Sequence, residues 1–309
     1  MQGVEGLEFL REILERQYGE ETAGEIFSGL SCNRAVTLRA NLLKSSTEEI
    51  AQTLVSAGIE FENAAWSREA FILKNARESA VWELPEYMEG KIYLQSLSSM
   101  LPPIVLNPKA GEDILDMAAA PGGKTTQLAA LSANRAHVTA CERNKIRAEK
   151  LKFNLARQGA NSVYVMVQDA RRLDNFLSFD KILLDAPCSG SGTLNLSGGK
   201  LPESFTEEFV SKSAALQLSL LKKAAGLVKK GGELVYSTCS VLESENEDNV
   251  LKILDSGFEI VPFSFEGMET IPSLPSKISG ALCVKPTEFY EGFFVCKMRK
   301  IQAGRGIKC

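Results

Sequence analysis

Apolar and polar positions alternate along most of the chain in a pattern that predicts strands and helices by turns. Short runs rich in Val, Ile and Leu predict buried strands, and the longer segments between them have apolar residues at helical spacing. The order is typical of an α/β fold with a mostly parallel seven-stranded sheet and helices on both faces. The predicted strands cover residues 114–117, 137–141, 163–167, 181–184, 233–236, 258–263 and 293–298. The predicted helices cover residues 124–131, 145–157, 206–228 and 243–254.

The first hundred residues follow a different pattern. Residues 1–30 have apolar positions at helical spacing and predict one or two amphipathic helices. A strand at 35–43, a helix that begins after Ser45, and strands at 59–61 and 70–73 follow. This order predicts a small α+β module, and a packing extension of the main domain is the alternative. We therefore expect a domain boundary near residue 100, with one domain at 1–100 and the other at 101–309.

A glycine turn links the first strand of the main domain to its helix. Apolar residues lead into Asp116, small residues follow at 117–121, and Gly122 and Gly123 precede the helix. Small residues let a polar ligand approach the main chain, and glycine adopts backbone angles closed to other residues. The turn matches neither the dinucleotide-binding fingerprint nor the phosphate-binding loop. It is therefore a candidate ligand site without a phosphate signature, and a plain strand-to-helix turn is the alternative.

Four predicted strands end in a carboxylate. Since the carboxyl ends of parallel strands meet at one edge of the sheet, these side chains surround the place where ligands of such folds bind. Glu142 follows the glycine turn by about 20 residues, the spacing of an acidic residue that accepts ribose hydroxyls, and Asp169 suits the exocyclic amine of adenine. Each one alone is better explained as a helix cap or a solvated carboxylate. Together they favour an adenosine cofactor, and the missing phosphate signature favours S-adenosylmethionine over NAD. The four are Asp116, Glu142, Asp169 and Asp185.

Composition narrows the class of protein. The chain has 309 residues, of which 44% are hydrophobic and 24% charged, and no apolar run approaches the roughly 20 residues of a membrane span. Residues 1–18 are too polar for a signal peptide. The seven cysteines form no CxxC pair and His137 is the single histidine, which argues against disulfides and a metal site. We therefore expect free thiols, a cytoplasmic location, and neither membrane nor metal.

Cys188 and Cys239 each lie just beyond a predicted strand, where the sheet edge opens onto the ligand site. Cysteine is usually a small buried hydrophobe, and this explanation suffices for Cys141 and Cys296. Two thiols at the ligand edge instead indicate covalent chemistry. Because a free thiol titrates near pH 8.5, a nearby cation such as Lys124 would raise the reactive thiolate fraction.

Several motifs resemble those of a single family. Met117–Thr125 (MAAAPGGKT), Asp185–Gly192 (DAPCSGSG) and Tyr236–Ser240 (YSTCS) resemble the Nol/Nop/Sun family of RNA cytosine-5 methyltransferases. The two cysteine motifs in this order are highly specific, whereas the glycine turn alone is not. The likeness runs from about residue 35 to residue 299. Further segments that resemble the family are Arg39 with Asn41, Tyr93–Gln95, Ser98–Met100, Glu245–Glu247 and Gly292–Phe294.

The resemblance implies a Rossmann-like S-adenosylmethionine-dependent methyltransferase fold and a mechanism. In this family the thiol of the Thr-Cys motif, here Cys239, attacks carbon 6 of cytosine and turns the ring into an enamine. The thiol of the Pro-Cys motif, here Cys188, helps to remove the proton from carbon 5. Asp185 would hydrogen-bond the ring, and Lys124 would contact the target nucleotide. The cofactor would lie on Ala118, Ala119, Ala120, Pro121, Gly122, Gly123, Lys124, Glu142, Arg147, Asp169 and Asp185.

The resemblance also implies an RNA partner, with ribosomal RNA as first choice and transfer RNA as second, and we expect a monomer. The net charge of −4 argues against nonspecific nucleic-acid binding but not against a local basic cleft. We expect Arg39, Asn41 and Lys91 to line such a cleft leading to Cys239. A buried Arg39 that pairs with a core carboxylate is the alternative. The N-terminal domain would then be an RNA-recognition-like module beside a catalytic domain.

One segment departs from the family pattern, and we consider two alternative functions. Residues 194–203 lack the tryptophan and arginine expected after the Pro-Cys loop, which affects RNA binding rather than the catalytic set. A catalytically idle RNA-binding or ribosome-assembly factor is one alternative, although the intact cysteines argue against it. A DNA cytosine-5 methyltransferase is the other. Such enzymes use the Pro-Cys thiol and lack the Thr-Cys motif, so the presence of both motifs favours RNA.

Overall fold

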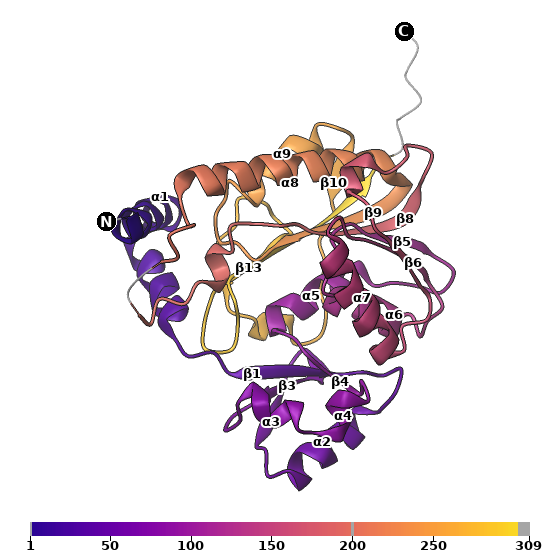
Figure 1. The fold of residues 1–309 in the computed structure, drawn as a ribbon. Helices are drawn as coiled ribbons and strands as arrows, with labels where there is room; N and C mark the ends of the chain where they lie inside the picture. The colour runs from indigo at the N-terminus through magenta and orange to yellow at the C-terminus, as the bar shows by residue number, and fades with distance from the viewer. Residues whose placement is uncertain (1, 199–200, 302–309) are drawn as a thin grey trace.

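The computed structural model describes residues 2–198 and 201–301, and Figure 1 shows a small sheet beside a larger α/β body. In the small sheet the strands pair antiparallel in the order β2-β3-β1-β4. Helix α2 (Thr47–Ser56) begins where the sequence predicts, because Ser46 Oγ accepts the backbone N–H of Glu49. Strand β4 follows two short helices that the sequence pattern did not predict. These elements are β1 (Val36–Ala40), β2 (Phe61–Ala64), β3 (Ser67–Leu73), α3 (Glu78–Trp82), α4 (Pro85–Met88) and β4 (Ile92–Leu94).

The larger sheet has nine strands among the described residues, in the order β11-β12-β13-β9-β8-β5-β6-β7, with β10 paired to β13. The pairs that link β9, β8, β5, β6 and β7 are parallel, and β13 pairs antiparallel with β9. This confirms the predicted α/β fold. The sheet has two more strands than predicted, because β11 and β12 are too short to give a periodic signal. The strands are β5 (Asp113–Asp116), β6 (His137–Cys141), β7 (Val163–Met166), β8 (Phe179–Asp185), β9 (Val228–Thr238), β10 (Phe258–Ile260), β11 (Ser273–Leu274), β12 (Leu282–Val284) and β13 (Phe293–Lys300).

Helices cover both faces of the larger sheet (Figure 1). The face toward the small sheet carries α5 (Leu97–Leu106), α6 (Gly123–Leu131) and α7 (Lys145–Gln158). The opposite face carries α8 (Glu207–Leu227) and α9 (Glu247–Leu254). Within residues 2–198 and 201–301, none of the helices combines the length and the apolar composition that a bilayer crossing requires. Three short 3₁₀ helices lie at Ala170–Arg172, Ser191–Thr193 and Met268–Thr270.

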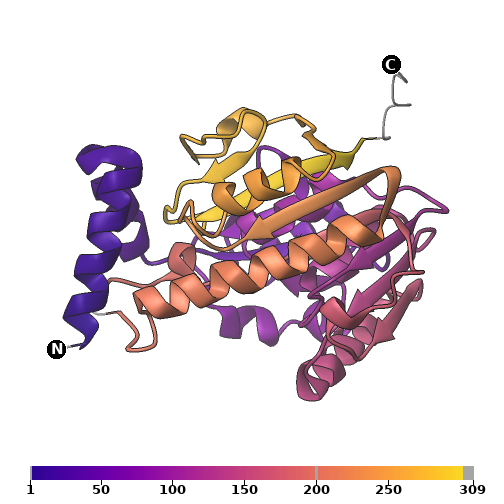
Figure 2. The same ribbon diagram turned by 90° about the horizontal axis from the view of Figure 1, so that it is seen from above.

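Helix α1 (Gln2–Ser31) packs against the larger body. Its buried residues Leu10, Leu14 and Ile26 share one hydrophobic cluster with Leu184 of β8 and with Phe205, just before α8. Figure 2 shows α1 beside the N-terminal end of α8. The small sheet is filled by a separate cluster of its own. By its packing, α1 is therefore part of the larger core, although the predicted boundary near residue 100 puts it with the small module.

Candidate active site

The glycine turn after β5 is held closely by its neighbours. Gly122 has a φ of 111°, and a Cβ there would lie 3.0 Å from Leu151 Cδ1 of α7, so this position requires glycine. Thr125 Oγ1 donates a hydrogen bond to Asp116 Oδ2 at 2.7 Å, which anchors the start of α6. Burial raises the pKa of Asp116 to about 6. The turn therefore presents a fixed stretch of main chain, residues 117–123, at the sheet edge.

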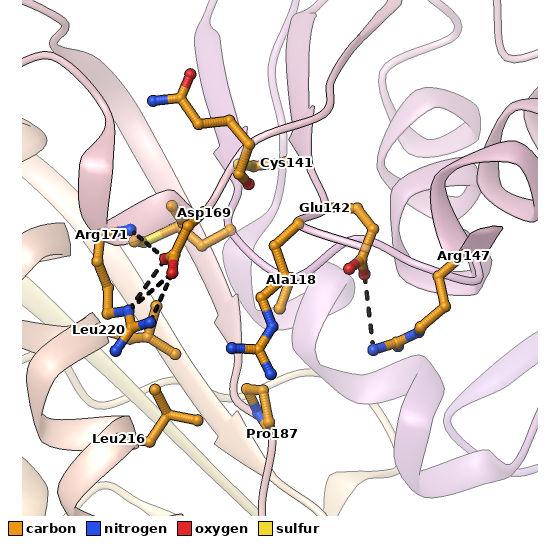
Figure 3. A pocket seen from close by; sticks show the side chains of 13 residues that line it. Ala118, Cys141, Glu142, Arg147, Asp169, Arg171, Pro187, Leu216 and Leu220 are labelled. Carbon is orange, nitrogen blue, oxygen red and sulfur yellow. Dashed lines mark hydrogen bonds and ion pairs between the residues drawn. The ribbon is translucent and has the colours of Figure 1, made fainter. Parts of the chain in front are cut away.

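Two pockets meet at this turn, and Ala118 lines both of them. The first, which we call the Glu142 pocket, has a volume of about 100 Å³ and lies at the ends of β6 and β7 (Figure 3). The second, which we call the Lys124 pocket, has a volume of about 270 Å³ and lies between the turn and β4. The arrangement places a strand-end carboxylate in each pocket, with the small Ala118 between them.

Glu142 extends into the Glu142 pocket from the end of β6, and its side chain is nearly buried. Its Oε1 accepts the backbone N–H of Asn144 at 2.7 Å. Arg147 Nη1 lies 3.7 Å from Glu142 Oε2, and Arg147 Nη2 donates to the carbonyl of Ala120 at 2.7 Å. A carboxylate offers about four acceptor positions, so Glu142 can accept further hydrogen bonds from a ligand.

Asp169, just beyond β7, is bound by an arginine that the sequence reasoning missed. Arg171 Nε lies 3.0 Å from Asp169 Oδ1, and Arg171 Nη2 lies 2.6 Å from Asp169 Oδ2. These hydrogen bonds lower the pKa of Asp169 to about 2. The available signal was the two-residue spacing, which a 3₁₀ turn brings back onto the carboxylate. An apolar wall of Leu216, Leu220 and Pro187 completes the pocket (Figure 3).

Lys124 and Asp185 form an ion pair in the Lys124 pocket. Lys124 Nζ lies 2.8 Å from Asp185 Oδ2 and 2.5 Å from Ser99 Oγ. Ser237 Oγ donates to Asp185 Oδ1 at 2.8 Å. Burial lowers the pKa of Lys124, but the charges of Asp185 and Cys239 outweigh burial and raise that pKa above its ordinary value. The lysine therefore stays charged beside the second cysteine.

The two cysteines at the sheet edge lie side by side. Their sulfur atoms are 3.0 Å apart, because β8 and β9 are parallel neighbours with Asp185 opposite Ser237. The hydrogen bond to Cys239, together with burial, raises the pKa of Cys188 well above its ordinary value. A hydrogen bond joins the two sulfur atoms, and either sulfur can be its donor. The pair thus contains one proton donor and one acceptor near a lysine.

A buried carboxylate to which the sequence reasoning gave no role holds both cysteine loops. Glu245 is fully buried and accepts hydrogen bonds from the backbone N–H of Ser189 at 2.8 Å and from Ser240 Oγ at 2.6 Å. Ser189 Oγ also donates to Glu245, at 2.5 Å. Because Ser189 follows Cys188 and Ser240 follows Cys239, one side chain ties the two loops together. The available signal was the Glu-Asn-Glu segment soon after the second cysteine.

The structure corrects the predicted RNA-binding roles of Arg39 and Asn41, each of which is only 1% exposed. Arg39 donates to Gln95 Oε1 and to Thr126 Oγ1, both at 3.2 Å. Asn41 Nδ2 donates to the carbonyl of Gln158 at 2.7 Å. Arg39 in β1 contacts α6, and Asn41, the residue after β1, contacts α7, so neither offers a surface to RNA. The alternative prediction, a buried Arg39 that pairs with a carboxylate, is right about the burial. Its predicted partner is wrong, because the hydrogen-bond partners of Arg39 are neutral groups.

Lys91, the third residue of the predicted cleft, is partly exposed. Its Nζ lies 2.9 Å from Glu49 Oε1 and 3.0 Å from Glu89 Oε2. Its role in RNA binding stays a prediction. Across the part of the chain that the structure describes, no group of three or more His, Cys, Asp or Glu side chains is arranged to hold a metal ion.

Comparisons with known proteins match both parts of the chain. The model of a family described as 16S rRNA methyltransferase RsmB/F matches residues 103–299, and a model described as the ferredoxin-like domain of RsmF/B-like methyltransferases matches residues 8–79. A solved structure of a methyltransferase homolog protein from Pyrococcus horikoshii is 32% identical, with a TM-score of 0.80, and the match covers 94% of this chain and 99% of that one.

Two curated proteins are similar over most of the chain. The ribosomal RNA small subunit methyltransferase F of Shewanella loihica is 37% identical over 276 residues, which cover 86% of this chain and 57% of that protein. A 25S rRNA (cytosine-C(5))-methyltransferase of Schizosaccharomyces pombe is 34% identical over 309 residues, which cover 95% of this chain and 50% of that protein. The chain thus spans about half the length of the curated relatives it matches.

Proposed function

Because the chain belongs to the RsmB/F branch of the Nol/Nop/Sun family of RNA cytosine-5 methyltransferases, we propose that it methylates carbon 5 of a cytosine in ribosomal RNA. The observation that carries this proposal is the pair of thiols 3.0 Å apart, next to the Lys124–Asp185 ion pair. The names of the similar proteins from Shewanella and Schizosaccharomyces specify ribosomal RNA, which supports ribosomal over transfer RNA as the substrate.

The Glu142 pocket fits the adenosyl part of S-adenosylmethionine. The carboxylate of Glu142 would accept hydrogen bonds from the ribose hydroxyls, and the Asp169 carboxylate, already held by Arg171, would accept the adenine amine. The apolar wall of Leu216 and Leu220 suits the flat face of a purine. Ala118 leaves room between the two pockets, so the methyl end would reach the Lys124 pocket. When bound, this cofactor supplies an electrophilic methyl group.

The reaction would begin at Cys239. Its thiolate adds to carbon 6 of the cytosine and forms a sulfur–carbon bond. The electron pair of the 5,6 double bond becomes available at carbon 5, which makes that atom nucleophilic. Asp185 accepts a hydrogen bond from the exocyclic amine as charge moves through the ring. Lys124 and Ser237 hold the carboxylate of Asp185 in place for this contact.

Cys188 would act in the release of the product. In the free protein, the hydrogen bond to Cys239 and burial raise the pKa of Cys188. Once Cys239 is bonded to carbon, the Cys188 thiol would give its proton to water. The Cys188 thiolate can then take the proton from the methylated carbon 5. The electrons of that carbon–hydrogen bond restore the 5,6 double bond, and the bond from Cys239 to carbon 6 breaks. Both cysteines are then ready for another turnover.

Incubation of the purified protein with ribosomal RNA and methyl-labelled S-adenosylmethionine tests the proposal directly. We expect label in the RNA and, after bisulfite treatment, a cytosine that resists conversion at one position. Transfer RNA in a parallel reaction distinguishes the two RNA classes. Label at a position other than carbon 5 of cytosine, or no label with either RNA from a protein that binds both cofactor and RNA, would refute the proposed activity.

Glu142→Ala is expected to weaken binding of S-adenosylmethionine at least about tenfold. A hydrogen bond to a charged acceptor contributes about 1.5 to 3 kcal/mol, and the ribose would lose that acceptor in a nearly closed site. Calorimetry with the cofactor measures the dissociation constant. Glu149→Ala, which removes an exposed carboxylate of the same region, is the control and should bind as the parent does. Equal affinity in both variants would mean that the ribose lies elsewhere.

A further inference from the structure

One face of α7 carries cations and exposed apolar side chains in alternation. The residues follow one another at spacings of three and four, so they form a single line along the helix. Ile146 is 82% exposed and Phe153 is 63% exposed, so this helix presents two large apolar side chains to solvent. We call this line the α7 stripe, and it consists of Ile146, Lys150, Phe153 and Arg157, with Arg143 two residues before the first residue of the helix.

The charge of the stripe is not balanced locally. Glu149 is the single acidic residue of α7; it lies beside the stripe and pairs with Lys152 at 2.9 Å. Within the described residues, Arg143, Lys150 and Arg157 make no ion pair. The whole chain has a net charge of −4, so this concentration of positive charge does not follow from composition. A surface of this kind is complementary to a polyanion.

The stripe ends in a basic hollow between α7 and the small sheet. Arg157 lies over the ring of Tyr87, 4.6 Å from its centroid, and 5.6 Å from the centroid of Phe153. Its buried Nε has no hydrogen-bond partner. Beside it opens a hollow of about 520 Å³, which contains three cations and one carboxylate. Its lining residues are Lys44, Met88, Glu89, Lys91 and Arg157.

The other end of the stripe reaches the candidate active site. Arg143 lines the Glu142 pocket. In the middle of the helix, Asn154 Nδ2 donates to the carbonyl of Pro121 at 2.8 Å, which attaches α7 to the turn that lines the Lys124 pocket. Figure 1 shows α7 on the side of the larger sheet that faces the small sheet. A chain lying along the stripe would therefore pass close to the pocket that holds the two catalytic groups Lys124 and Asp185.

We propose that the α7 stripe and the adjoining hollow bind a single-stranded segment of the substrate RNA next to the target cytosine. Lys150, Arg157 and Lys44 contact phosphates, and Phe153 stacks on a base. The proposal rests on the proposed RNA methylation and gives it a docking surface in place of the predicted cleft of Arg39 and Asn41. Alternating cations and flat apolar side chains are the combination by which proteins hold unpaired nucleotides.

A double variant tests the stripe without touching the candidate active site. Lys150→Ala with Phe153→Ala removes one phosphate contact and one stacking contact. Loss of one stacked base alone weakens binding at least about fivefold, and loss of one phosphate contact lowers the slope of log affinity against log salt by about 0.7. Fluorescence anisotropy with a labelled stem-loop of ribosomal RNA, at several salt concentrations, measures both quantities. Lys44→Ala tests the hollow separately and should lower the slope by a similar amount.

Lys152→Ala is the matched control, because it removes a lysine from the same helix on the side away from the stripe. It should keep the parental RNA affinity. All variants should bind S-adenosylmethionine as the parent does, and the stripe variants should show a raised KM for RNA at an unchanged kcat. Parental affinity and salt slope in both the double variant and Lys44→Ala would overturn the proposal. Since affinity is measured apart from turnover, a parent that binds RNA but fails to methylate it refutes the function and not the surface.

Discussion

Cys239→Ala is expected to abolish methyl transfer while leaving the affinity for S-adenosylmethionine nearly unchanged. The cytosine ring is a poor nucleophile at carbon 5 until a thiolate adds to carbon 6, so removal of the attacking sulfur removes the only covalent route the site provides. Loss of a nucleophile from a cooperating set costs on the order of 10⁴-fold or more in kcat. The proposed contacts to the adenosyl group lie in the Glu142 pocket, which Cys239 does not line.

The measurement is single-turnover transfer of labelled methyl to ribosomal RNA, beside a cofactor titration. Cys32→Ala is the control, because this thiol is partly exposed near the end of α1 and is not part of the site. It should react at the parental rate. If Cys239→Ala retains even a tenth of the parental rate, the nucleophile has been assigned to the wrong cysteine.

Cys188→Ala is expected to trap the RNA on the protein. Attack by Cys239 and methyl transfer do not need Cys188 in the proposed mechanism, but removal of the proton from carbon 5 does. The two sulfur atoms are 3.0 Å apart, so no other thiol is as well placed to take that proton. The methylated adduct would then persist through denaturation, and a denaturing gel should show a band of reduced mobility that contains both protein and RNA.

A double variant is the control for the trapped protein–RNA adduct. The double variant Cys188→Ala with Cys239→Ala cannot form the sulfur–carbon bond and should give no shifted band. Ribonuclease treatment of the single variant should return the band close to the mobility of free protein. If Cys188→Ala instead turns over repeatedly and gives no adduct, then another group removes the proton and the two-thiol mechanism is wrong.

Periodicity predicted most elements of the larger sheet because its central strands β5 and β8 are largely buried and its helices bury one face. Register between parallel strands then explains why Asp185 and Ser237, far apart in the chain, bring Cys188 and Cys239 together. Short elements such as β11 and β12 could not be predicted in this way. The packing of α1 on the larger core also could not, since an amphipathic helix does not specify which partner covers its apolar face.

Some residues of the candidate site could be predicted from the sequence, and others could not, because their roles depend on tertiary contacts. Strand ends and loop motifs identified the strand-end carboxylates, Lys124 and the glycine turn of the two pockets, but not the apolar wall or the groups that hold these residues. Glu245 and Arg171 act through contacts that depend on tertiary structure. The spacing of Arg39 and Asn41 predicted that they share one face of a strand; Asn41 lies one residue beyond β1, and both side chains point into the larger body. Spacing cannot tell a face that meets solvent from a face that meets another domain. Because Arg39 and Asn41 are buried, they do not line the predicted RNA-binding cleft.

The burial of Arg39 and Asn41 also bears on how the enzyme would choose its cytosine. Their hydrogen bonds cross from β1 to α6 and α7, and leaving one such buried group unpaired costs about 1 to 3 kcal/mol. The small sheet is therefore clamped on the larger body instead of swinging on a hinge. The distance between the basic hollow and Cys239 is then fixed. If the proposed docking surface binds RNA, we expect a cytosine to be modified when the folded RNA places it at this fixed distance from the docked segment, so that target choice would follow from RNA shape as much as from base sequence.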